Sequence, residues 1–185
     1  MLLIELKNIF ESGKSFAKQK IDWQILTNGF AGNFVEDGLT YQIRLIIIPT
    51  DAPDIGIFYN KLVYNIQFGL VNGPNELSMA KTGKMNSAVI MNIVQNEAWA
   101  KLKTENLDPD IISLSVSTDP FHNNHDDVRR RVSLYTRFAN KLGPINGYPE
   151  IYSNIPGKIS INVIMSKFKI EGNDMAILKR KLLNK

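Results

Sequence analysis

DDVRRRVSLYTRFANKLG, residues 126–143, decides most of the fold, because its apolar residues recur at the spacing of an amphipathic helix. The residues that share this face are Val128, Val132, Tyr135, Phe138 or Ala139, and Leu142. Asp126 and Asp127 suit the positive end of a helix dipole, and Gly143 followed by Pro144 is a typical helix end. The pattern predicts a helix that buries Tyr135 against a sheet and leaves its arginines in solvent.

The segments around this helix have the patterns of strands and of a second helix. Residues 40–49 alternate and then become continuously apolar, residues 61–71 alternate throughout, and residues 111–117 are rich in β-branched side chains. Residues 87–102 carry an apolar stripe at helical spacing. Residues 27–34 are rich in glycine and asparagine and are expected to form turns. Residues 148–168 are expected to form a broken or bulged strand pair.

This order predicts the α/β (α+β) class, with a mixed sheet whose first half is antiparallel and with helices at both ends. We expect a single domain over residues 1–185. Its parts would be an N-terminal helical segment (1–22), a mixed-sheet core (40–168) and a basic C-terminal helix (173–185) with Asp174 as its N-cap.

The composition narrows the chemistry. The chain has no cysteine, which excludes disulfides, thiolate metal sites and cysteine nucleophiles. Its net charge of +4 is compatible with an anionic partner. The apolar runs, such as residues 45–49, are far shorter than the ~20 residues of a membrane helix, and Glu5 and Lys7 interrupt the apolar start. We expect a protein of a reducing compartment that does not enter a membrane.

A family resemblance covers about residues 60–165. A serine-rich strand leads through an asparagine-containing loop to the helix VSLYTRFANKLG, and KTGKMNSAVIMNIV (81–94) precedes them. This succession resembles the C-terminal part of the GNAT N-acyltransferase fold, and it also resembles uncharacterised proteins of tailed bacteriophages. The resemblance implies a GNAT-like sheet, acetyl-CoA as cofactor, and Tyr135 as the acid that protonates the departing thiolate. The pyrophosphate loop that it implies consists of Lys81, Thr82, Gly83 and Lys84.

The same loop departs from the GNAT pattern, which has Gln or Arg, two residues, Gly, one residue, and then Gly or Ala. Ala80 stands at the first of these positions and Met85 at the last. The Met85 side chain would crowd a pyrophosphate that main-chain N–H groups hold. Pro144 replaces the phenylalanine that usually follows the terminal glycine. These departures predict that acetyl-CoA does not bind with micromolar affinity.

Two other motifs have simpler explanations. His122 and His125 are weak candidates for metal ligands, because His-x-x-His beside carboxylates can bind a divalent cation. A polar loop that caps a helix explains the same run, and no metal is expected. ESGKS (11–15) imitates the end of a P-loop, but Asn8 stands where the first glycine is required, so we interpret it as chance.

Two groups of basic residues are candidate interaction sites. They are Arg130, Arg137 and Lys141 on the helix of residues 126–143, and Lys179, Arg180 and Lys181 on the last helix. Helices that pack on a sheet usually expose such residues to water, and no aromatic residues for base stacking are interleaved with them. We expect contact with a protein partner or a second copy of the chain, with weak nucleic-acid binding as the alternative.

The degenerate loop and the lack of a clear catalytic set favour a non-catalytic, phage-type structural or accessory protein without a cofactor. Such a protein would act through protein–protein contacts in the virion or in the host cytoplasm. A CoA-dependent N-acyltransferase of the GNAT type is the alternative, and a basic nucleic-acid-binding module is the third hypothesis.

Overall fold

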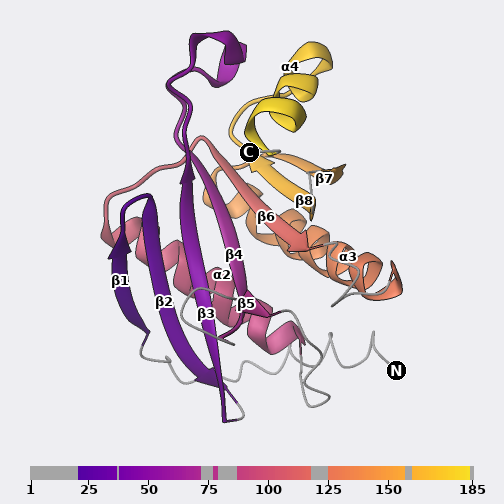
Figure 1. The fold of residues 1–185 in the computed structure, drawn as a ribbon. Coiled ribbons are helices and arrows are strands. Elements are labelled where there is room, and N and C mark those ends of the chain that lie inside the picture. Colours follow the sequence, from indigo (N-terminus) through magenta and orange to yellow (C-terminus); the bar gives the residue numbers. More distant parts are fainter. Residues whose placement is uncertain are drawn as a thin grey trace.

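A computed structural model describes residues 21–36, 38–71, 77–78, 87–117, 125–156 and 160–183, with the backbone alone for 77–78, 87–91, 117 and 127. The described residues form one mixed sheet with helices against it, which confirms the α/β class (Figure 1). The strands are β1 (Asp22–Leu26), β2 (Gly29–Glu36), β3 (Leu39–Ile48), β4 (Val63–Val71), β5 (Leu77–Ser78), β6 (Ile111–Ser117), β7 (Glu150–Pro156) and β8 (Ser160–Ser166).

The sheet has the order β1-β2-β3-β4-β6-β8-β7, and β5 pairs with β4 outside this path. The pairs from β1 to β4 are antiparallel, as the sequence predicts for the first half of the sheet. β4 and β6 are parallel, and α2 (Ser87–Thr104) lies between these two strands in the sequence. The pairs β6–β8 and β7–β8 are again antiparallel.

Thr27 and Asn28 form the turn of the β1–β2 hairpin, but the rest of the predicted turn segment 27–34 belongs to β2, and the sheet begins at Asp22 and not at residue 40. The glycines serve the strand itself. A Cβ on Gly29 (φ +149°) would lie 1.8 Å from the Leu45 carbonyl oxygen, and one on Gly32 would lie 2.8 Å from the Trp23 ring. Both positions need glycine for close approach and not for a turn. The predicted N-terminal helical segment lies outside the described residues except at its end, where Asp22 belongs to a strand.

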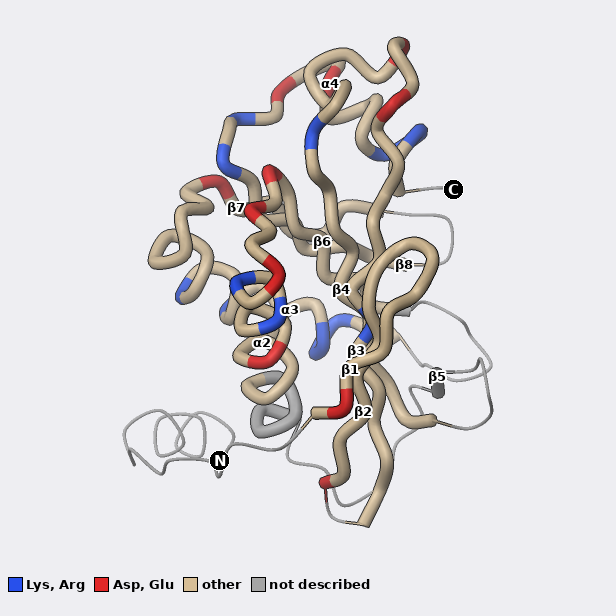
Figure 2. Tube along the Cα trace, turned by 90° about the vertical axis from the view of Figure 1, so that its left-hand side faces the viewer, with Lys and Arg blue, Asp and Glu red and all other residues tan. Residues whose placement is uncertain are grey.

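The two long helices cover one face of the sheet (Figures 1 and 2), where α3 (His125–Leu142) is the predicted helix of residues 126–143. Its predicted apolar face is buried at Val128, Val132, Tyr135, Phe138 and Ala139. From α2, Val94, Ala98 and Leu102 join the same core. Alternate residues of the central strands point into this core, namely Tyr41, Ile43 and Leu45 of β3, Tyr64 and Ile66 of β4, and Ile112, Leu114 and Val116 of β6.

The opposite face is apolar at one end. There Ile48, Val63, Ile111 and Ile164 pack under η1 (Pro53–Phe58) and the C-terminal helix. This helix runs as α4 (Gly172–Ile177) and continues in a π-helical turn, η3 (Leu178–Leu182).

The ends of two helices and a strand pair test three further predictions. Asp174 lies in the first turn of α4 and Glu171 is the N-cap residue, without a side-chain cap, so the prediction of Asp174 as N-cap is wrong. The bulge predicted between the last strands is confirmed as a register shift between Tyr152 and Ile155. After α3, Gly143 leads into η2 (Pro144–Asn146), as the helix-end signal predicts.

Candidate functional site at the divergence of two parallel strands

β4 and β6 separate partway along their length (Figure 1). Their parallel pairing runs only from Val63 opposite Ile111 to Ile66 opposite Leu114, whereas β4 continues to Val71 and β6 to Ser117. β3 pairs with the other edge of β4 over this whole region. The facing edges of β4 and β6 are therefore no longer paired with each other beyond Ile66 and Leu114.

β5 shortens the free edge of β4. Its pairing with β4 begins at Leu70, opposite Ser78. Residues 67–69 of β4 are left between the two ladders, and on this edge they have no strand partner among the described residues. Main-chain N–H and C=O groups of a strand edge pair readily with an added extended chain. The geometry suits a ligand that carries amide groups.

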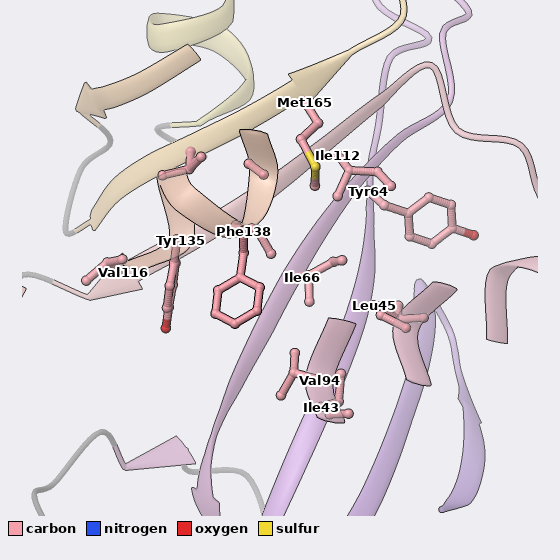
Figure 3. Close-up of a cluster of buried hydrophobic side chains, with 14 of the residues drawn as sticks. Ile43, Leu45, Tyr64, Ile66, Val94, Ile112, Val116, Tyr135, Phe138 and Met165 are labelled. Carbon is pink, nitrogen blue, oxygen red and sulfur yellow. The ribbon is translucent and has the colours of Figure 1, made fainter. Parts of the chain in front are cut away.

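Tyr135 approaches this divergence from α3. Its side chain is 2 % exposed, and its ring packs against Phe68 of β4 with centroids 5.6 Å apart. Figure 3 shows the ring extending from α3 between Val116 and Phe138, toward the side on which β4 and β6 separate. The predicted core position of Tyr135 is thereby confirmed.

The Tyr135 hydroxyl is buried and has no hydrogen-bond partner in the described part of the chain. Leaving a buried hydroxyl unpaired costs about 1–3 kcal/mol, so such a group calls for a partner that the described residues do not supply. Burial raises the pKa of Tyr135, and the nearby Arg131 charge opposes this only in part. The hydroxyl therefore stays protonated at neutral pH and is available as a donor.

A second unpaired polar atom comes from α2. Gln95 is only 4 % exposed, and its buried side-chain oxygen accepts no hydrogen bond from the described residues. Like Tyr135, Gln95 belongs to a helix on the core-facing side of the sheet. The sequence alone does not single out Gln95. The one signal for it is a polar side chain beside the apolar stripe of residues 87–102.

The other predicted site residues divide into two groups. Lys81, Thr82, Gly83, Lys84 and His122 lie outside the described residues. His125 begins α3 and is exposed, and the described residues contain no group of three side chains that could hold a metal ion.

The basic residues do not gather on one element. In Figure 2 the Lys and Arg positions are spread along the trace and are interspersed with Asp and Glu. Arg130, Arg137 and Lys141 are exposed on α3, Arg180 is exposed and Lys179 half-buried on η3, and Lys181 pairs with Asp54 of η1. The last contact joins the C-terminal helix to η1, so Lys181 has a structural partner within the chain.

Comparison of the chain with protein-family models, with curated proteins and with solved structures gave no match. Among the described residues, no helix is both long and apolar enough to span a bilayer.

Proposed function

We propose that the chain is an acyl-CoA-dependent N-acyltransferase whose acyl donor binds where β4 and β6 diverge. The observation that carries this proposal is the buried hydroxyl of Tyr135, which has no partner in the described part of the chain and lies against the diverging strand. Acetyl-CoA would enter as a substrate whose acyl group is already activated as a thioester. The sequence gives this activity as its alternative hypothesis, and the buried Tyr135 hydroxyl supports it.

Two features of the chain fit such a donor. The edge of β4 at residues 67–69 offers main-chain groups that have no strand partner among the described residues, and the pantetheine arm of CoA carries amides that can pair with them. The succession β4, α2, β6, α3 agrees with the GNAT resemblance. Ala80 and Met85 still argue against tight pyrophosphate binding, so we assign most of the affinity to the pantetheine arm.

Tyr135 is the proton donor in this proposal. Its raised pKa keeps the hydroxyl protonated at neutral pH, so it enters the reaction as a hydrogen-bond donor and not as a base. As the acceptor nitrogen bonds to the acyl carbon and the carbon–sulfur bond breaks, the hydroxyl gives its proton to sulfur. The acceptor nitrogen loses one proton to solvent and a proton from solvent restores the tyrosine, so the amide and the free thiol are the net products.

An assay for free thiol tests the transfer. Thiol release from acetyl-CoA should require both the wild-type chain and a primary amine, and the acylated amine should appear in equal amount by mass spectrometry. Thiol release that is the same without amine would reveal hydrolysis and contradict a transferase. The absence of thiol release with every amine in a chemically varied set would reject the proposal.

A non-catalytic role through protein contacts is the second candidate, and one observation favours it. Ile25 of the edge strand β1 is 84 % exposed. β1 pairs with β2, and its other edge has no strand partner among the described residues. An open edge with an exposed apolar side chain can pair with the same edge of a second copy. Such a contact would suit a structural or accessory protein of a virion or an infected cell.

Ile25→Lys tests this candidate. If β1 pairs with β1 of a second copy, the wild-type chain should sediment as a dimer and Ile25→Lys as a monomer, because the variant loses the apolar contact of Ile25 across the shared edge. Gln24→Lys is the matched control on the same strand, since Gln24 belongs to the opposite face. A wild-type chain that stays monomeric at high concentration would remove the support for this candidate.

A further inference from the structure

The face of the sheet opposite α2 and α3 changes from apolar to polar along the central strands. Ile48 and Val63 lie under the C-terminal helix, and farther along the same face β3 presents Arg44 and Gln42, which alternate with the core residues of that strand. Beside them, β4 presents Gln67, which is paired with Arg44 across the strands. This polar row is half-buried and crosses the sheet at the level where β4 and β6 separate.

Amide and hydroxyl groups make up one side of the row, on β4, β6 and β8. Ser115 Oγ donates to Asn162 Oδ1 at 2.6 Å and lies 2.9 Å from the side-chain oxygen of Asn65. Asn162 in turn donates to the main-chain oxygen of Ile155 at 3.2 Å. Asn162 is 1 % exposed, so this network is fixed in place and uncharged.

Arg44 is the charged group on the other side of the row. Its Nε donates to Gln42 Oε1 at 2.6 Å, and Gln42 donates to Asn33 Oδ1 at 3.0 Å. These two bonds orient the guanidinium, but no carboxylate of the described residues forms an ion pair with it. The side chain of Gln67 likewise has no hydrogen bond within the described part of the chain.

A half-buried arginine that is oriented by neutral amides is prepared for an anion from outside the chain. Its planar fork of N–H donors matches a carboxylate in a bidentate geometry. Arg44 is paired with Gln67, the first residue of β4 beyond the last β4–β6 pair. Adjacent strands are about 4.8 Å apart, so an anion at Arg44 lies within a small molecule's length of the divergence.

We propose that this polar row is the acceptor site, and that the acceptor is a small amine that carries a carboxylate, with Arg44 holding the carboxylate. The inference rests on the proposed acyl transfer and specifies its second substrate. Tyr135 reaches the divergence from the α2–α3 face, and the acceptor approaches from the opposite face. The amine and the departing sulfur thereby lie on opposite sides of the acyl group.

Matched pairs of acceptors test the proposal, because L-lysine and cadaverine, or L-tyrosine and tyramine, differ only in the carboxylate. Wild-type kcat/KM should be at least about 10-fold higher for the amino acid of each pair, and Arg44→Gln should raise its KM about 10- to 100-fold. The same variant should leave the KM for the matched amine unchanged. The KM of Arg44→Lys for the amino acid should fall between those of wild type and Arg44→Gln, since lysine keeps the positive charge but lacks the paired N–H donors of a guanidinium.

Arg130→Gln, which removes an exposed arginine from α3, is the control and should leave the KM of both the amino acid and the matched amine unchanged. Equal rates within each pair, with no selective effect of Arg44→Gln, would overturn the acceptor assignment and leave acyl transfer standing. Binding of L-lysine and L-tyrosine, measured by NMR titration, separates the other outcomes. If the amino acids bind in a way that depends on Arg44 but the chain shows no turnover, the binding site stands and the transferase is rejected. If the chain shows neither binding nor turnover, both the site and the transferase are rejected.

Discussion

Replacing Tyr135 with phenylalanine is expected to slow acyl transfer by a factor of about 10²–10⁴, the usual contribution of a positioned acid. The ring and its contact with Phe68 remain, and the hydroxyl that is removed has no partner within the described residues. The free energy of unfolding should therefore stay the same or rise by up to about 1 kcal/mol. Tyr135→Ala would be less informative, because the lost ring alone should cost about 3–5 kcal/mol.

Tyr148→Phe is the matched control for this result. The Tyr148 side chain is as deeply buried, but its hydroxyl donates to the Pro109 main-chain oxygen at 2.7 Å, before β6 begins. The loss of that bond should cost about 1 kcal/mol of stability and leave the turnover rate unchanged. Steady-state rates and urea denaturation of the two variants give both quantities. A Tyr135→Phe chain with full turnover would remove Tyr135 from the chemistry.

Gly29→Ala is expected to be the most destabilising small substitution in the first hairpin, at about 3–5 kcal/mol. The added Cβ would lie 1.8 Å from the Leu45 carbonyl oxygen, and the backbone has φ +149°. The strands cannot separate to make room without breaking the β2–β3 ladder, in which Gly29 lies opposite Ile46.

Gly147→Ala controls for the backbone conformation alone. Gly147 also has a positive φ (+87°), but a Cβ there would meet no atom within 4 Å. Its cost should be about 1 kcal/mol. Urea denaturation of the two variants gives the comparison, and equal losses would mean that the close contact at Gly29 is relieved by a small shift of the strands.

Local patterns predicted the parts of the fold whose periodicity is strong. α3 and β6 lie within a residue of their predicted bounds, because one apolar face or one β-branched run dictates each of them. β2 was missed since its glycines were interpreted as turn residues, although Gly32 serves to admit the Trp23 ring. That contact is between two strands, and neither strand's own sequence reveals it.

The candidate site was predictable only in part, for a similar reason. Tyr135 was assigned from the sequence to the apolar face of its helix, and the GNAT resemblance gave it a second role. Arg44 and Gln67 each have the pattern of an ordinary solvent-facing residue on a strand. The role proposed for them depends on the cross-strand register and on the end of the β4–β6 ladder, which are tertiary features.

Calorimetric titration of the wild-type chain with acetyl-CoA tests the central claim most directly, since the sequence of the pyrophosphate loop predicts weak binding and the β4–β6 divergence predicts a bound pantetheine arm. We expect a saturable 1:1 complex with Kd below about 1 mM, which is the weak end of the ordinary range for enzyme substrates. ADP, which lacks the pantetheine arm, should bind far more weakly. The Tyr135→Phe chain should bind equally well. No saturable heat with acetyl-CoA, or equal affinity for ADP, would contradict binding of an acyl donor between β4 and β6.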